Sequence, residues 1–192
     1  MAEMVQGLAA CAGELGWIHL MGMLLEKLYK MTSIHVWGGV TPYWVKYSLL
    51  KIIWKACRKF VMQCIAPYCI STTIRILLYR LCGVHIGKHV FIGMRCYIDD
   101  MEPQMIFIGD NVSVSFLVCL CTHGKRQTHT PIRIEDGAYV GCRTTVLSGK
   151  RGVTIGKNAV VGACSFVNKD IPPDMTAVGV PARIMKTNVD RG

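Results

Sequence analysis

Aliphatic residues recur every six positions through the second half of the chain, and this period restricts the fold more than any other feature. They form four triplets: Ile86, Ile92, Ile98; Ile108, Val114, Leu120; Ile134, Val140, Val146; and Ile155, Val161, Val167. An α-helix would require a spacing near 3.6, and an amphipathic strand would alternate. A period of six predicts a solenoid with three short sides per coil, in which each aliphatic side chain points inward and stacks on its equivalent in the next coil.

Two further features accompany the repeat. The residue two positions before each aliphatic is small or β-branched throughout: Val84, Val90, Cys96, Ile106, Val112, Val118, Ile132, Ala138, Thr144, Val153, Ala159 and Ser165. Glycine directly follows the aliphatic at positions 87, 93, 109, 141, 156 and 162, where we expect it to turn the backbone at a corner.

Breaks in the register locate loops that project from the solenoid. Extra residues fall around 101–104, 121–131 and 150–152, and the last of these adds Lys150 and Arg151. Insertions of this kind often carry binding or catalytic residues. The longest one contains both His123 and His129, so it is the first candidate for a functional site.

Composition narrows the class of protein. The chain has 192 residues, a formal net charge of +10 and 52% hydrophobic residues, which excludes an intrinsically disordered protein. Residues 1–25 contain Glu3 and Glu14 without a basic stretch before the apolar residues, so we expect no export signal. The ten cysteines are therefore expected to be reduced thiols in a cytoplasmic protein, and they include no C-x-x-C spacing typical of a metal site.

Positive charge is concentrated in the N-terminal part. No acidic residue occurs between Glu26 and Asp99. Residues 43–63 are predicted to form a helix with basic residues on one face and Trp, Leu and Phe on the other. Such a helix suits an anionic membrane surface, where it would be peripheral at the inner face of the plasma membrane. The alternative is that it packs on the rest of the protein or on a sister subunit.

A transmembrane span and a nucleic-acid partner are both disfavoured. Residues 8–25 are the nearest approach to a span, but Glu14 and His19 interrupt them. No helix-turn-helix, zinc-finger or RNA-binding signature accompanies the positive charge.

The repeat, the His-bearing loop and the tail 168–186 together resemble the hexapeptide-repeat acyltransferases. The most specific segments are 108–111 (IGDN), 121–123 (CTH) and 169–183. The nearest likeness is to the sugar O-acetyltransferase branch, which includes galactoside, maltose and colanic-acid acetyltransferases. The resemblance implies a mainly β protein: a left-handed parallel β-helix that assembles as a homotrimer. On this basis residues 1–82 form a helical, basic, Trp-rich segment, residues 83–171 the β-helix, and residues 172–192 a short C-terminal cap, tail or helix.

The same resemblance implies an active site that uses acetyl-CoA as acyl donor, with no metal. His123 matches the general base, and histidine suits this task because an imidazole titrates near neutral pH. A backbone N–H would stabilise the oxyanion. The positions that match cofactor contacts are Cys142, Ala163, Asn168, Lys169 and Arg183. The candidates for acceptor contacts are Asp99, Asp100, Tyr139 and His129.

Three functions stay open at this point. The first is O-acetylation of a sugar hydroxyl, in surface polysaccharide or lipid-linked glycan synthesis. The loop lacks the longer sugar-gripping insertion of the galactoside enzymes, which disfavours a free disaccharide as the acceptor. The second is N-acylation of an amino sugar. The third is a metal protein like the gamma-class carbonic anhydrases, which hold zinc with three histidines; His85, His89, His123 and His129 are available, although their spacing matches no ligand set.

Overall fold

The computed structural model describes residues 27–28, 31, 49–124 and 128–187. The chain divides into two compact units, Met1–Ala56 and Cys57–Gly192, and the second contains the whole solenoid. The first six residues of the predicted helix 43–63 lie outside the described part of the chain. The three-part division predicted from the sequence stays a prediction.

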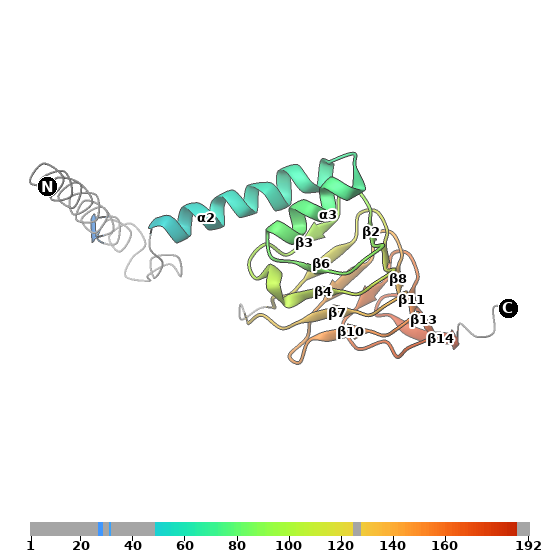
Figure 1. Ribbon diagram of the computed structural model, residues 1–192. Coiled ribbons are helices and arrows are strands. Elements are labelled where there is room, and N and C mark those ends of the chain that lie inside the picture. The colour runs from blue at the N-terminus through green and yellow to red at the C-terminus, as the bar shows by residue number, and fades with distance from the viewer. Residues whose placement is uncertain (1–26, 29–30, 32–48, 125–127, 188–192) are drawn as a thin grey trace, which may run out of the picture. The chain divides into compact units, whose positions relative to one another are not determined.

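Residues 85–167 form a parallel β-helix of four coils with three sides (Figure 1). Sheet A contains β1 (His85–Ile86), β4 (Ile106–Ile108), β7 (Ile132–Ile134) and β10 (Val153–Ile155). Sheet B contains β2 (Phe91–Ile92), β5 (Ser113–Val114), β8 (Tyr139–Val140) and β11 (Val160–Val161), and sheet C contains β3 (Tyr97–Ile98), β6 (Cys119–Cys121), β9 (Thr145–Leu147) and β12 (Phe166–Val167).

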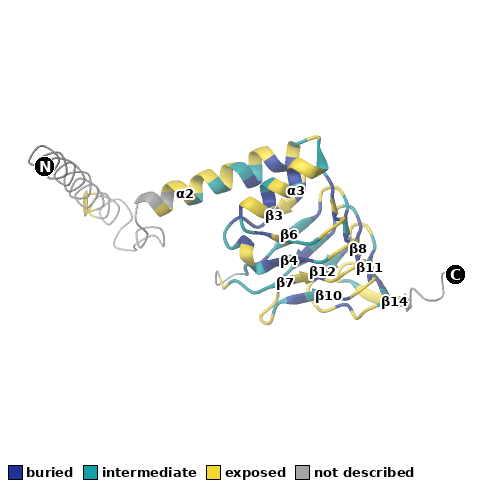
Figure 2. Ribbon diagram, viewed as in Figure 1, coloured by how far each residue is buried: buried dark blue, intermediate teal, exposed yellow. Residues whose placement is uncertain are grey.

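The strand register is the one that the six-residue period predicts. Ile98 pairs with Leu120, Leu120 with Val146 and Val146 with Val167, and sheets A and B show the same alignment of repeat positions. Eleven of the twelve repeat aliphatics are buried and Ile86 is half-buried, while all twelve residues two positions earlier are buried (Figure 2). The solenoid prediction is therefore confirmed.

The six glycines that follow the repeat aliphatics have a different structural role from the one expected. None of the six has a positive φ; the left-handed residues lie three positions after the aliphatic. They are His89, Arg95, Asn111, Leu117, Gly137, Arg143, Asn158, Cys164 and, after Ile171, Asp174. The glycines instead allow the coils to approach one another: a Cβ on Gly141 would lie 2.6 Å from the Ala163 nitrogen. The expectation that these glycines turn the backbone was wrong.

A helical segment precedes the first coil. It comprises α2 (Leu49–Phe60), a π-helical turn (Val61–Ile65), a 3₁₀ turn (Ala66–Tyr68) and α3 (Thr72–Leu81). Ser71 caps α3, since its Oγ accepts a hydrogen bond from Ile74 N–H at 3.5 Å. Among the described residues, no helix is long and apolar enough to cross a membrane.

The C-terminal segment, expected to be a cap, tail or helix, contains a β-hairpin. The strand β13 (Met175–Val178) adds to sheet B beside β11, and β14 (Arg183–Thr187) pairs with β13 in the antiparallel direction. A cis Val180–Pro181 bond lies between them. The hairpin covers the last rung of sheet B, so it caps that end of the solenoid.

The stacked core gives a first prediction. Ile134 is 1% exposed and lies in the middle of sheet A, so Ile134→Ala leaves a cavity and should lower the free energy of unfolding by about 2–5 kcal/mol. Ile184, which is 53% exposed, provides the matched control, and Ile184→Ala should change it by less than about 0.5 kcal/mol. Urea denaturation followed by circular dichroism measures both. Equal effects would contradict this account of the core.

Candidate active site

The strands of sheet C end along one edge of the solenoid. Because β3, β6, β9 and β12 are parallel neighbours, the residues that follow them form a column, which we call the C edge. It carries residues 99–100 after β3, 122–123 after β6, 148–149 after β9 and 168–169 after β12. The C edge therefore brings the candidate base next to residues that lie far from it in the sequence.

His123 is paired with Asp99 at this edge. The Nδ1 atom of His123 lies 2.6 Å from Oδ2 of Asp99, whose side chain has no exposed surface. The histidine ring itself is 25% exposed. Since a carboxylate accepts and cannot donate, Nδ1 of His123 carries a proton, and Nε2 is left as the atom able to take one.

Asp99 is held by a set of donors from its own chain. Its Oδ1 accepts a hydrogen bond from Met101 N–H at 3.0 Å, and its Oδ2 accepts from Thr122 N–H at 2.9 Å and Thr122 Oγ–H at 2.8 Å. Burial by itself would raise the pKa of the Asp99 carboxyl. The hydrogen bonds from Met101, His123 and Thr122 outweigh burial and lower that pKa below its ordinary value. Asp99 is thus a buried carboxylate that stays ionised.

His129 joins the same group from the other end of the loop. Its Nδ1 lies 3.4 Å from Thr122 Oγ1, and its ring centroid lies 5.8 Å from that of His123. The single hydroxyl proton of Thr122 is given to Asp99, so His129 Nδ1–H donates to the hydroxyl oxygen. A bridge between positions 123 and 129 fixes the base of the loop.

Cys121 lies close to this pair without competing with it. Its Sγ is 3.7 Å from His123 Nδ1. Burial raises the pKa of the Cys121 thiol, so the sulfur stays protonated at neutral pH. Cys121 therefore does not compete with His123 as a proton acceptor.

Two predicted acceptor residues point elsewhere. Asp100 is 8% exposed, and its Oδ1 accepts a hydrogen bond from Gln63 Nε2 at 3.0 Å. Tyr139 is 44% exposed but lies on β8, in sheet B, paired with Ser113 and Val160. Within one chain, neither side chain is brought to His123.

The predicted cofactor residues fall into three places. Asn168 and Lys169 are exposed on the C edge, two coils from His123. Cys142 and Ala163 lie at the opposite end of sheet C, at its corner with sheet B, where Cys164 N–H donates to the Cys142 carbonyl at 2.8 Å. Arg183 is exposed at the start of β14.

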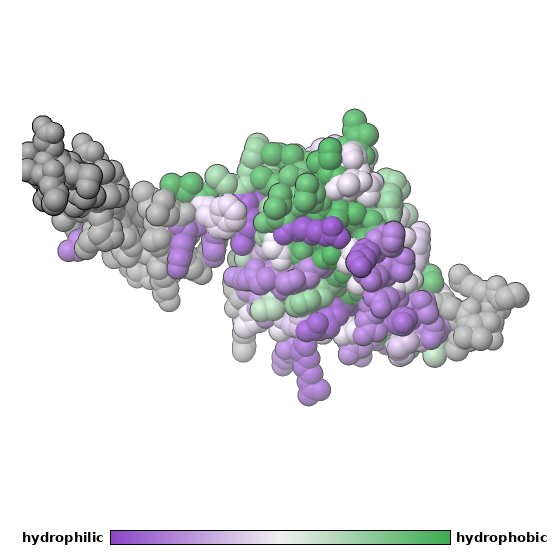
Figure 3. Space-filling view, viewed as in Figure 1, coloured by the Kyte–Doolittle hydropathy of each residue, from purple (hydrophilic) through white to green (hydrophobic). Residues whose placement is uncertain are grey.

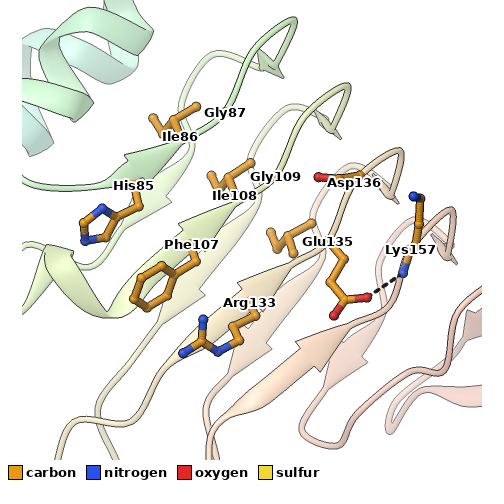
Figure 4. A pocket seen from close by; sticks show the side chains of 11 residues that line it. His85, Ile86, Gly87, Phe107, Ile108, Gly109, Arg133, Glu135, Asp136 and Lys157 are labelled. Atoms are coloured by element: carbon orange, nitrogen blue, oxygen red, sulfur yellow. Dashed lines mark hydrogen bonds between the residues drawn. The ribbon is translucent and has the colours of Figure 1, made fainter.

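A shallow groove of about 590 Å³ lies on the outer face of sheet A (Figure 4). His85 stacks on Phe107 with ring centroids 4.7 Å apart, and the Arg133 guanidinium lies 4.3 Å from the centre of the Phe107 ring. Glu135 Oε2 accepts a hydrogen bond from Lys157 N–H at 3.0 Å. The groove places His85 in an aromatic stack, so it is not a third histidine for the loop pair.

The donor set at the C edge bears on the metal alternative. Asp99, His123 and His129 each offer one ligand atom, and these atoms lie within 4.8 Å of one another. This set has two histidines and a carboxylate whose oxygens already accept four hydrogen bonds. It is unlike the three-histidine site of the gamma-class carbonic anhydrases and favours proton transfer.

Comparisons with known proteins agree with this fold. The family model "hexapeptide repeat of succinyl-transferase" matches residues 83–115 and 131–169. Galactoside O-acetyltransferase of Escherichia coli is 35% identical over 119 residues, which cover 57% of this chain and 56% of the enzyme. A serine acetyltransferase of Bacillus licheniformis is 31% identical over 159 residues, 81% of this chain and 68% of the enzyme.

Among solved structures, a hexapeptide-repeat acetyltransferase of Vibrio cholerae in complex with acetyl coenzyme A is similar. It has a TM-score of 0.60 and 27% identity, and the match covers 73% of this chain and 90% of that one. The chain belongs to the hexapeptide-repeat acyltransferase family. The galactoside relative supports the sugar O-acetyltransferase branch, although this chain spans only about half of its length, 56%.

The hydrogen bonds of Asp99 give a prediction for stability against pH. The amide introduced by Asp99→Asn would have to turn its NH₂ group toward Met101 N–H or toward Thr122, both of which are donors, so this substitution should lower the free energy of unfolding at pH 7. Since folding lowers the Asp99 pKa, the stability that the carboxylate supplies is present above the ordinary value of 3.8 and is lost as the pH falls through the folded-state value.

The measurement is urea denaturation of wild type and Asp99→Asn from pH 7 downward. The gap between the two should be constant near neutral pH and shrink below about pH 4. Asp170→Asn is the control, because the exposed Asp170 carboxylate accepts from Thr154 N–H through Oδ1 alone, a bond that Asn can keep. A gap that widens toward acid pH would contradict the assignment of Asp99 as an ionised carboxylate.

Proposed function

We propose that this protein is an acetyl-CoA-dependent O-acetyltransferase that acts on a sugar hydroxyl, with His123 as general base. The observation that carries the proposal is the 2.6 Å pair between His123 and the fully buried Asp99. The acetyl coenzyme A bound by the similar Vibrio cholerae protein supports the choice of donor, and the galactoside O-acetyltransferase relative supports the choice of acceptor.

In this proposal Nε2 of His123 takes the proton from the acceptor hydroxyl as its oxygen attacks the carbonyl carbon of the acetyl thioester. The imidazolium then returns the proton to the leaving thiolate when the carbon–sulfur bond breaks, giving the ester and free CoA. Asp99 holds the proton on Nδ1, orients the ring and stabilises its charged form. No oxidant, reductant or metal is needed to balance the step.

Asp99 thereby changes its role. The sequence suggested that it contacts the acceptor, but its side chain is buried and both of its oxygens are occupied by donors of the same chain. We assign it instead to the positioning of His123. Asp100 is tied to Gln63 and is likewise removed from acceptor binding, while His129 stays a candidate for contact with the acceptor at the loop.

The proposal includes a homotrimer, because the predicted cofactor residues Asn168 and Lys169 lie at the opposite edge of sheet C from Cys142 and Ala163. A neighbouring copy can bring its Cys142–Ala163 corner, with Tyr139 on the adjoining sheet, to the His123 edge of the first. In such a cleft the closely stacked backbone at Gly141 and Ala163 would line the pantetheine arm, and Asn168, Lys169 and Arg183 would meet the polar end of the donor.

For the acceptor we propose a sugar on a lipid carrier or a nascent surface polysaccharide, met by a cytoplasmic enzyme that is peripheral at the membrane through residues 43–63. The positive charge of the N-terminal part supports this peripheral location at the membrane, since residues 27–98 contain no acidic side chain. A second acceptor, the hydroxyl of serine, is favoured by the Bacillus licheniformis relative.

The base is tested by His123→Ala. Turnover should fall by about 10²–10⁴ because general base catalysis contributes a factor of that size, while the dissociation constant for acetyl-CoA stays within a few fold. Calorimetric titration measures binding and chromatographic detection of CoA measures turnover. His85→Ala is the control, since His85 lies in the sheet A groove, and it should leave both unchanged. If the wild-type protein does not bind acetyl-CoA, the proposed function is wrong, because acetyl-CoA is its acyl donor.

The acceptor class is tested by mass spectrometry of product mixtures. Purified protein with acetyl-CoA is offered galactosides, amino sugars, lipid-linked sugars and free serine in separate reactions. The proposal expects acetyl esters on sugar hydroxyls and loss of ester formation in His123→Ala. Acetylserine as the favoured product would reassign the acceptor, and an acetylamide on an amino sugar would reassign the bond formed.

A further inference from the structure

The helix α3 buries two polar side chains deeply and leaves several aliphatic ones exposed, while Ile76 and Leu78 pack partly against the core. Arg75 and Tyr79 are the side chains that it buries most deeply, at 1% and 0% exposure. Arg75 donates to the carbonyls of Ile92 and Cys69, and Tyr79 Oη lies 3.5 Å from the Cys96 carbonyl oxygen. A helix on a soluble domain normally turns such groups outward and its aliphatic residues inward.

Exposed aliphatic side chains lie on the outward side of the same helix, beside the exposed Thr73 and Arg80. Ile70, just before α3, is 90% exposed, and Ile74, Leu77 and Leu81 are 51%, 53% and 68% exposed. Their spacing of four, three and four positions puts them on one side of the helix, and we call these four residues the α3 face. Figure 3 shows hydrophobic residues gathered over this region, while hydrophilic residues cover the coils below it.

Exposed aliphatic residues that occur singly need no explanation, but a contiguous group indicates an interaction surface. Tyr68 and Ile65, in the turns before α3, extend the group with exposures of 58% and 43%. Within the described residues of the unit Cys57–Gly192, all six side chains keep at least two fifths of their surface exposed. Exposing these aliphatic side chains to water is unfavourable in free energy, so the α3 face is expected to have a partner.

Charge indicates what that partner is. Within the unit that carries the α3 face, residues 57–98 contain six Lys and Arg and no acidic residue. Exposed basic side chains lie before, on and after α3: Lys59, Arg80 and Arg95, with Arg95 N–H bonded to the Pro67 carbonyl at 2.8 Å. Lys88 is also exposed, but its N–H donates to the exposed Asp110 carboxylate at 2.7 Å. The first carboxylates that follow, Asp99 and Asp100, are 0% and 8% exposed, so they do not offset this charge at the surface.

We propose that the α3 face docks on an anionic lipid bilayer, with the aliphatic side chains among the acyl chains and the basic residues at the headgroups. This inference goes beyond the membrane contact considered for residues 43–63, because it rests on a different element in the unit that carries the active site. Apolar burial together with basic residues at an anionic surface is what holds interfacial helices in place.

A second copy of the chain is the competing occupant. Two α3 faces brought together would also bring together two sets of basic residues, with no acidic residue between positions 57 and 98 to pair with. Like charges across an interface oppose association. The membrane is therefore the better fit, and the competing occupant becomes an outcome of the test.

The test uses the full chain and sedimentation with vesicles of pure phosphatidylcholine or of phosphatidylcholine with phosphatidylglycerol. Wild type should bind the anionic vesicles and be released by high salt. Leu77→Glu should weaken binding by at least about tenfold. Ile184→Glu is the matched control, since Ile184 on β14 is also 53% exposed, and it should leave binding unchanged.

Circular dichroism checks that each variant is folded, and light scattering gives its mass. Equal binding of wild type and Leu77→Glu to anionic vesicles would overturn the proposal, as would no binding by wild type. A lower mass for Leu77→Glu than for wild type, with vesicle binding unaltered, would identify the α3 face as a subunit contact. Acetyl-CoA titration of the same samples keeps this outcome separate from that of the proposed function.

Discussion

The close stacking of successive coils is the constraint on which the rest of the structure depends. Parallel strands in a sheet are about 4.8 Å apart, so each coil must lay every side directly on the one before it. Residues with a Cβ cannot be tolerated everywhere: at Gly87, Gly93, Gly109, Gly141 and Gly156 an added Cβ would come within 2.7 Å of the next coil. Once this stacking is met, the inward column of Ile, Val and Leu packs at every level, and residues at equal repeat positions become neighbours.

The pairing of equal repeat positions brings the residues of the candidate site together. Ile98 and Leu120 pair across β3 and β6, and the residues just beyond them continue side by side although they are more than twenty positions apart in sequence. Asp99 therefore reaches His123 without any special loop geometry, while Met101 and Thr122 supply the donors that keep its carboxylate ionised. The long insertion follows His123 and brings His129 back against Thr122.

The sequence was sufficient for the fold but only partly for the site. The six-residue period identified the inward positions, since both sets of repeat residues are buried. The same period also places Asp99 near His123, because Ile98 and Leu120 occupy equivalent positions of their triplets. The resemblance to the family instead suggested an acceptor contact for Asp99, which its burial rules out. The glycines were misassigned because glycine suits both a left-handed turn and a close approach, and only the backbone dihedral angles separate the two. The C-terminal hairpin had no periodic pattern to reveal it.

The helical segment and the site are joined through the strand end that carries Asp99. Gln63 Nε2 donates to the Ile98 carbonyl and to Asp100 Oδ1, both at 3.0 Å, and the Arg58 guanidinium donates to the carbonyls of Asp100 and Met101 at 2.9 and 3.0 Å. These bonds hold residues 98–101 on both sides of Asp99, so the partner of His123 is positioned partly by the segment that leads into α3. A membrane surface bound to α3 would therefore act on the same helical segment that helps to orient His123. This gives a physical reason for the candidate active site and the docking helix to occupy one compact unit.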